Sequence, residues 1–259
     1  MKSFSSIIWT VLGLSLLAVL GYILYYSLCF VGLAGCIQTY KWNEKMTLVV
    51  ETPQGVKQAS SVQSVAFIVD DTPLVKGAST WIRGEAVVLE VLPGKYLFAL
   101  LKGGDGNWKR KDLLLNRYTE KRFQEKLGLK EADMKFRTQK ERVAITMKAK
   151  GIPFELNPNE TPMFVTFTDI SDPTSIKKVD SFNLTAFFGE GVKLKAITLE
   201  VTEEPIERGR IINLLKWFGS PKIFRNPGWA SLTPEVQQAI SGLVDSKTTL
   251  EITKNWSRK

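Results

Sequence analysis

The chain has 259 residues, of which 44% are hydrophobic and 24% are charged, with 35 Lys and Arg against 26 Asp and Glu. These fractions are those of a folded chain of one or two domains, which excludes global disorder. Histidine is absent, so Ser-His-Asp or Cys-His catalysis and zinc sites built on imidazole are excluded.

The amino-terminal segment over residues 7–37 contains no charged residue. As a helix, these 31 residues would extend about 46 Å, more than the roughly 30 Å hydrocarbon core of a bilayer. We therefore predict a membrane segment over residues 1–37. A buried core helix is the less favoured alternative, because core helices of this length rarely lack a polar face.

Two fates are consistent with this segment. Its apolar run exceeds the roughly 7–15 residues of a cleavable signal, and Tyr22, Tyr25 and Tyr26 suit an interfacial aromatic belt, which favours an uncleaved signal-anchor. The tetrapeptide 33–36 (LAGC) instead resembles the lipobox of bacterial lipoproteins and makes Cys36 a candidate lipidation site. Cys29 and Cys36 both lie in this segment, so we expect the sheet and helices alone to hold the exported body, without a disulfide framework.

Both fates place the rest of the chain on the same side of the membrane. We expect a bacterial inner-membrane protein with its body in the periplasm, or a lipoprotein tethered by Cys36. The flanking charges, Lys2 before the segment and Lys41, Glu44 and Lys45 after it, separate the two sides weakly. A body that faces the cytoplasm is therefore kept as an alternative.

Strand and turn signals begin at residue 46. Residues 46–51 and 56–69 are rich in strand formers and flank a proline turn at 52–55. Residues 85–91 and 96–101 flank Pro93-Gly94, a type II turn signal, and predict a hairpin. Both hairpin strands are nearly continuous in apolar residues, so we expect them to be central in a sheet and covered on both faces.

Alternating apolar residues predict further strands at 143–147, 163–168 and 195–202. Three helices are expected: residues 119–127 before Gly128, residues 206–218 between Pro205 and Gly219, and a helix with Thr233 as N-cap and Pro234 in its first turn. The fold class is therefore α+β, a mainly antiparallel sheet with packed helices, forming one domain over residues 38–259. A charged insertion is expected over about 103–142, and a body divided there is the alternative.

Positive charge is concentrated in residues 101–150, which hold 15 Lys and Arg against 7 Asp and Glu. Near an anionic membrane surface each such cation adds roughly 1 kcal/mol of attraction. The partners weighed are anionic lipid, anionic glycan or an acidic envelope protein, and no nucleic acid is expected behind an export anchor. The mixed charges in this stretch favour the interpretation that it is a solvated face whose charges bind nothing in particular. The candidate surface residues are Lys109, Arg110, Lys111, Arg117, Lys121 and Arg122.

Candidate catalytic chemistry is sparse. Asp169 and Asp172, which follow a predicted strand, are the best available carboxylates for a hydrolase or for a Ca²⁺-type ion. They lack the spacing of an EF-hand loop, and a capped turn is the favoured interpretation. We predict no catalytic residue, no metal site and no cofactor.

Several stretches resemble those of uncharacterised bacterial envelope proteins with an amino-terminal membrane segment. They are residues 40–53 (YKWNEKMTLVVETP), 60–62 (SSV), 95–101 (KYLFALL), 165–173 (VTFTDISDP) and 187–202 (FFGEGVKLKAITLEVT). The resemblance covers most of residues 40–217, implies a bacterial exported protein, and carries over no functional residue. The expected function is non-catalytic binding or scaffolding in the envelope. The alternatives are an envelope hydrolase that uses carboxylates, and a cytoplasm-facing protein that binds anionic lipid through its basic segment.

Overall fold

The protein is described from a computed structural model of the full chain. It describes residues 4–30, 36–72, 76–103, 114–116, 120–130, 138–157, 161–220 and 228–245. The chain divides into two compact units. Unit 1 comprises Met1–Tyr40 and Ala66–Thr80, and unit 2 comprises Lys41–Val65 and Trp81–Lys259.

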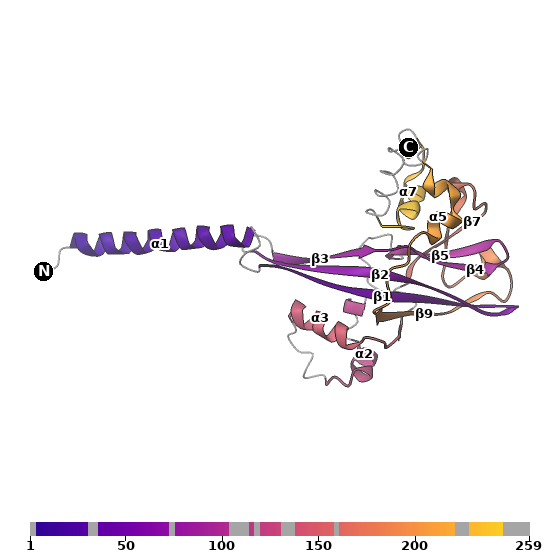
Figure 1. Cartoon of the computed structure of the whole chain (residues 1–259), viewed down its shortest axis with the longest axis horizontal. Helices are drawn as coiled ribbons and strands as arrows, with labels where there is room; N and C mark the ends of the chain where they lie inside the picture. Colours follow the sequence, from indigo (N-terminus) through magenta and orange to yellow (C-terminus); the bar gives the residue numbers. More distant parts are fainter. Residues whose placement is uncertain are drawn as a thin grey trace. The chain divides into compact units, whose positions relative to one another are not determined.

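Unit 1 contains one long apolar helix, α1 (Phe4–Phe30), drawn in indigo in Figure 1. Its 27 residues correspond to about 40 Å, and Trp9–Cys29 is long and apolar enough to cross a membrane. Large apolar side chains are exposed along it, among them Trp9 at 74% and Leu17 at 66%. An apolar helix that buries so little has the properties of a membrane anchor or a signal segment, not of a core helix.

A disulfide joins Cys29, at the end of α1, to Cys36, and the two Cα atoms are 5.3 Å apart. Both residues are buried. The backbone N–H of Asp71 donates to the Cys36 carbonyl at 2.8 Å, which ties the end of β2 to the residue before β1. The sequence did not predict this bond. Both cysteines lie in the amino-terminal segment, and the expectation was only that the exported body has no disulfide framework.

The first sheet has five strands in the order β3-β2-β1-β9-β6. Its members are β1 (Ile37–Thr52), β2 (Gly55–Asp71), β3 (Lys76–Arg83), β6 (Phe154–Glu155) and β9 (Lys193–Thr202). β1 and β9 are antiparallel, and Leu48 lies opposite Ile197. Gly55 adopts φ +113° at the turn between β1 and β2, as a glycine readily does. The strands predicted at 46–51, 56–69 and 195–202 are confirmed.

The second sheet lies in unit 2 and has the order β4-β5-β7-β8. Its members are β4 (Val87–Leu92), β5 (Lys95–Gly103), β7 (Pro162–Phe167) and β8 (Ile176–Val179). The Pro93-Gly94 hairpin is confirmed, with Gly94 at φ +72°. β5 is central, but β4 is an edge strand, so the expectation of two central strands is wrong for β4. The chain after α7 pairs with the residue before β4, because Ala86 N–H donates to the Leu243 carbonyl at 2.8 Å.

Helices pack on the second sheet and complete the core of unit 2. They are α5 (Arg210–Leu214), the 3₁₀ helix η5 (Lys216–Gly219) and α7 (Pro234–Ser241). Phe98 and Phe167 meet edge to face at 5.3 Å in this core. Thr233 caps α7 as predicted. The single helix predicted over 206–218 is wrong, because Gly209 is left-handed at φ +96° and Leu215 leaves helical geometry.

Residues 120–157 add two helices on the other side of the unit 2 strands from α5 and α7 (Figure 1). The first, α2 (Lys121–Lys126), is followed by the left-handed Gly128, as predicted. The second, α3 (Gln139–Lys148), replaces the strand predicted at 143–147, which is wrong. Thr138 and Glu141 form a reciprocal capping box at the start of α3. The remaining short elements are η1 (Leu114–Asn116), η4 (Pro173–Ser175) and α4 (Thr185–Phe188). The predicted α+β class is confirmed.

Candidate binding groove

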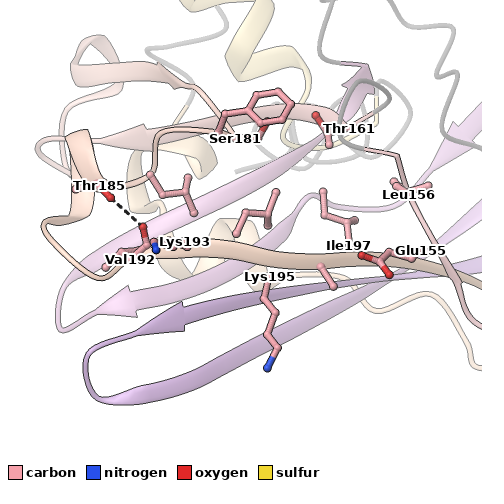
Figure 2. Close-up of a pocket in the computed structure, with 13 residues that line it drawn as sticks. Glu155, Leu156, Thr161, Ser181, Thr185, Val192, Lys193, Lys195 and Ile197 are labelled. Atoms are coloured by element: carbon pink, nitrogen blue, oxygen red, sulfur yellow. Dashed lines mark hydrogen bonds between the residues drawn. The ribbon is translucent and has the colours of Figure 1, made fainter.

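A groove of about 330 Å³ runs along β9 in unit 2 (Figure 2). One wall is formed by Val192 and the first five residues of β9, 193–197. The other wall comes from residues 181–185, which follow β8, and Glu155, Leu156 and Thr161 complete the lining. This volume falls in the range of small-ligand and peptide side-chain sites.

The groove is mostly apolar. Leu156, Leu184, Val192 and Ile197 are buried around it. Phe182, in contrast, is 69% exposed, although its ring is large enough to gain about 2 kcal/mol from burial. A single exposed aromatic side chain is common on protein surfaces, so Phe182 is a candidate contact only because it also lines the groove.

Hydrogen bonds hold the wall opposite β9 in place. The Thr185 hydroxyl donates to the Val192 carbonyl at 3.2 Å, as Figure 2 shows. The Asp180 carboxylate accepts the Phe182 N–H at 2.9 Å, and the Asp180 carbonyl accepts the Asn183 N–H at 3.0 Å. The turn that presents Phe182 is therefore fixed by its own backbone contacts.

A wider and more polar hollow lies beside α5. Its lining includes Glu90, Tyr96, Glu207, Arg208 and Arg210. Arg210 is already engaged, because its guanidinium donates to the Ser60 carbonyl at 2.9 Å and pairs with Glu207 at 3.3 Å. We therefore regard the groove beside β9 as the stronger candidate for a binding site.

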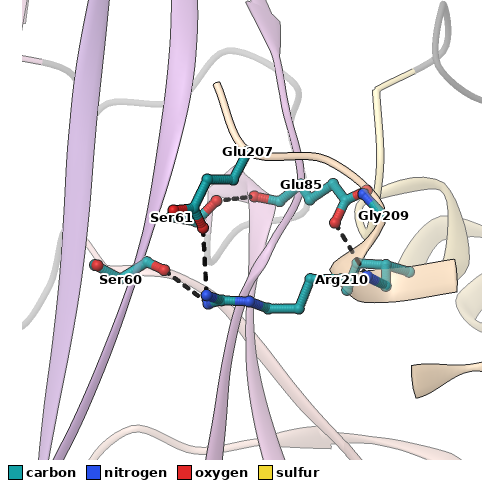
Figure 3. A network of polar contacts seen from close by, with 7 residues as sticks. Ser60, Ser61, Glu85, Glu207, Gly209 and Arg210 are labelled. Atoms are coloured by element: carbon teal, nitrogen blue, oxygen red, sulfur yellow. Dashed lines mark hydrogen bonds and ion pairs between the residues drawn. The ribbon is translucent and has the colours of Figure 1, made fainter. Parts of the chain in front are cut away.

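The buried carboxylate of Glu85 is structural (Figure 3). It accepts the N–H of Gly209 at 2.6 Å and of Ile211 at 3.0 Å, which satisfies free donors at the start of α5. The Glu85 carbonyl accepts the Ser61 hydroxyl at 2.8 Å. Glu85 thus links β2, the chain before β4 and α5, and its oxygens are occupied.

A serine and a lysine meet at the end of α7. Lys102 is a buried residue, only 3% exposed, and its ammonium donates to the Ser241 hydroxyl and to the Gln238 carbonyl, both at 2.9 Å. Burial lowers the pKa of Lys102 to about 8. The Ser241 hydroxyl itself donates to the Gln238 carbonyl at 3.0 Å. This is the arrangement of a lysine that caps the carboxy-terminal turn of a helix, and the Ser241 proton is directed to the backbone, away from the lysine.

Asp169 and Asp172 serve two separate turns. Asp169 Oδ1 accepts the N–H and hydroxyl of Ser171, at 2.8 and 2.7 Å, and these hydrogen bonds lower the pKa of the Asp169 carboxyl. Asp172 Oδ1 accepts the N–H of Thr174 at 2.8 Å and caps η4. Neither carboxylate lines the groove or the hollow beside α5. Among the described residues, no group of three acidic or thiol side chains is placed to hold a metal ion.

Two of the six predicted surface cations belong to α2. Lys121 lies 3.9 Å from Glu125, and Arg122 donates to Glu120 at 2.9 Å. Such pairs on one exposed helix weaken the field that the cations present to an anionic partner. The other four, Lys109, Arg110, Lys111 and Arg117, lie outside the described residues, so binding of an anionic surface stays a prediction.

Cys36 is disulfide-bonded, and its sulfur is therefore not free for a thioether bond to lipid. A lipoprotein cleaved before Cys36 also loses residues 1–35, and with them Cys29. The disulfide and lipidation are thus mutually exclusive, and lipidation stays a prediction for a processed form of the chain.

Comparison with protein-family models, with curated proteins and with solved structures finds no match. The resemblance to bacterial envelope proteins is accordingly still a prediction. The groove residues were also not foreseen. They come from stretches near residues 155–161, 181–185 and 192–197, which are distant in sequence. No local pattern in these stretches predicts that their residues line one groove.

Proposed function

We propose that the protein is a non-catalytic, membrane-tethered binding or scaffolding protein of the bacterial envelope, with its body in the periplasm. The apolar groove beside β9, with the exposed Phe182 at its wall, is the observation that carries the binding function. α1 provides the tether, since it is long and apolar enough for a membrane anchor.

The Cys29–Cys36 disulfide supports the periplasmic location. Disulfides persist in oxidising compartments and are rare in the cytoplasm. Because this bond lies at the carboxy-terminal end of α1, it supports a topology in which that end of the helix and the body after it lie on the oxidising side of the membrane.

The hydrolase alternative receives less support. Asp169 and Asp172 are exposed or half-buried turn residues that hydrogen-bond within their own turns. A general acid needs a carboxyl whose pKa is raised, whereas the Asp169 pKa is lowered. A deep polar pocket around both carboxylates would favour catalysis, but neither carboxylate lines the apolar groove beside β9 or the polar hollow beside α5.

Site-specific photocrosslinking in intact membranes tests the proposal. A photoreactive phenylalanine analogue at position 182 is compared with the same analogue at Trp81, which is 60% exposed in the same unit but does not line the groove. A discrete crosslinked product at position 182 that is absent at position 81 supports a binding function. Equal labelling at both positions, or no product at either, contradicts it.

A further inference from the structure

The carboxy-terminal end of α1 lies at the level of the phospholipid headgroups when α1 spans a bilayer. The hydrocarbon core accommodates about 20 helical residues, so a span that begins at residues 7–9 ends at residues 26–28. Cys29 follows about 2–5 Å further along the helix, within a headgroup layer that is roughly 5–7 Å thick on each side. Tyr25, which is 49% exposed, suits this level because tyrosine prefers the membrane–water interface.

The disulfide brings the start of the first sheet to the same level. The Cα atoms of Cys29 and Cys36 are 5.3 Å apart, and the Tyr25 hydroxyl lies 3.8 Å from Cys36 Sγ. Cys36 directly precedes β1, and its carbonyl accepts the N–H of Asp71, the last residue of β2, at 2.8 Å. These residues all belong to unit 1. The start of β1 and the end of β2 are therefore held beside the end of α1.

The chain between the two cysteines would not hold this distance without the bond. Cys36 is 7 residues after Cys29, and an extended chain of that length reaches about 24 Å. This reach is several times the thickness of the headgroup layer. The disulfide is therefore the covalent link that keeps the start of β1 at the level of the headgroups.

The residues at this end of the first sheet suit contact with lipid. Ile37, the first residue of β1, is 44% exposed although it is apolar, and an apolar side chain gains free energy at the boundary of headgroups and acyl chains. By sequence, the segments that connect α1 to β1 (VGLAG, 31–35) and β2 to β3 (PLV, 73–75) contain no polar side chain. Connecting segments on a water-exposed surface are usually rich in turn-forming polar residues.

The charges nearest to this end in sequence are balanced. They are Asp70, Asp71, Lys41 and Lys76. Anionic lipid attracts clusters of cations, and two cations beside two carboxylates are not such a cluster. A zwitterionic phospholipid is therefore the partner that fits this surface.

We propose that the Cys29–Cys36 disulfide clamps the membrane end of the first sheet into the phospholipid headgroup layer, where Ile37 and Gln38 contact lipid. The partner of this surface is zwitterionic phospholipid, and no anionic lipid is needed. The inference rests on the membrane tether of the proposed function. It adds a second lipid contact, which the folded body makes and a covalent bond fixes.

Depth-dependent quenching tests the contact. Gln38→Cys, at an exposed position, is labelled with an NBD maleimide, which does not react with the disulfide-bonded cysteines. The full chain is placed in phosphatidylcholine nanodiscs that contain a lipid with a nitroxide on its headgroup. Val56→Cys is the control, because Val56 is 55% exposed and follows the turn at the other end of β1. We expect quenching at position 38 at least threefold stronger than at position 56, and equal quenching overturns the contact.

Removal of the disulfide tests the clamp. In the double variant Cys29→Ser/Cys36→Ser, quenching at position 38 should fall at least twofold, towards the value at position 56. Urea unfolding followed by Trp fluorescence checks that the body of the double variant is folded. Quenching that is equally strong with and without the bond shows that the disulfide does not hold the sheet at the membrane, which overturns the clamp.

A loop insertion tests the clamp without removing the bond. Six Gly and Ser residues are inserted between residues 30 and 36, and a thiol count confirms that Cys29 and Cys36 are still oxidised. Because the disulfide bypasses the insertion, quenching at position 38 should stay within about 1.5-fold. A fall of more than twofold in the oxidised chain means that the loop, not the bond, sets the position of the sheet.

Lipid composition tests the kind of partner. Replacement of one third of the phosphatidylcholine by phosphatidylglycerol should leave quenching at position 38 within about 1.5-fold. Quenching that requires the anionic lipid overturns the assignment of a zwitterionic partner.

Failure of the inference is distinct from failure of the tether. Flotation of the full chain with phosphatidylcholine vesicles on a sucrose gradient reports whether α1 anchors the protein. If the chain floats but position 38 is not quenched, only the headgroup contact is wrong. If the chain does not float, the tether of the proposed function fails, and this inference fails with it.

Discussion

Lys102 shows how one buried side chain can resemble a catalytic group and still be structural. Its ammonium is surrounded by the Gln238 carbonyl and the Ser241 hydroxyl at the end of α7, where a positive charge meets the negative end of the helix dipole. Desolvation nevertheless disfavours the charged form and lowers the Lys102 pKa to about 8. The two effects oppose each other, and their balance determines how stability varies with pH.

The first prediction is a pH-dependent stability difference between the wild type and Lys102→Met. The pKa of Lys102 is about 8 in the folded state against 10.5 for a free lysine. Between these values the unfolded chain binds more protons, so wild-type stability relative to Lys102→Met rises with pH. The slope is at most about 1.4 kcal/mol per pH unit.

Urea unfolding of the detergent-solubilised chain, followed by Trp fluorescence, measures this difference. Between pH 6 and 7 the difference should stay constant, because both states hold the proton. A difference that is equally constant from pH 8 to 10 would show that Lys102 is not desolvated.

At the level of elements, contacts between distant residues decide where the helices begin. The sequence predicts a helix over 206–218, but α5 begins only at Arg210, where the Glu85 carboxylate accepts the first backbone donors. Glu85 is 124 residues away from Gly209 in sequence, so no local pattern reveals this cap. For α3 a local signal existed: the Thr138-Glu141 capping box outweighs the alternation of Val143, Ile145 and Met147, which by chance imitates a strand.

The strands were predicted better than the helices for a physical reason. The β1–β2 and β4–β5 hairpins are specified by proline and glycine turns next to the strands themselves. Strand order, in contrast, depends on contacts made far along the chain. The same limitation applies to the candidate groove, because its lining residues come from stretches that are distant in sequence.

The second prediction concerns the Glu85 contact between elements. Glu85→Ala leaves the N–H groups of Gly209 and Ile211 without their acceptor in a buried site, and each unsatisfied donor costs about 1–3 kcal/mol. We expect a loss of about 2–4 kcal/mol in unfolding free energy, measured by urea titration. Glu207→Ala is the control: it removes an exposed carboxylate paired with Arg210 and should cost less than about 1 kcal/mol. Equal losses would mean that Glu85 does not hold α5 in place.

For the whole molecule, the two cysteines report both compartment and processing. The sequence leaves three topologies open: an uncleaved anchor with a periplasmic body, an anchor with a cytoplasmic body, and a lipoprotein cleaved before Cys36. Each gives the Cys29–Cys36 pair a different chemical state. In the first the thiols are oxidised, in the second they are reduced, and in the third Cys29 has been removed and Cys36 carries lipid.

The third prediction follows from these states. Cells are quenched with acid, the chain is denatured, and a polyethylene-glycol maleimide counts free thiols by gel shift before and after reduction. We expect no modified cysteine before reduction and two afterwards, because the disulfide links Cys29 and Cys36. Cys36→Ser serves as the control and should show one free thiol in both lanes.

Two free thiols before reduction would place the body in the cytoplasm. No thiol in either lane, with a chain shortened by residues 1–35, would identify the lipoprotein and remove α1 as the anchor of the mature protein.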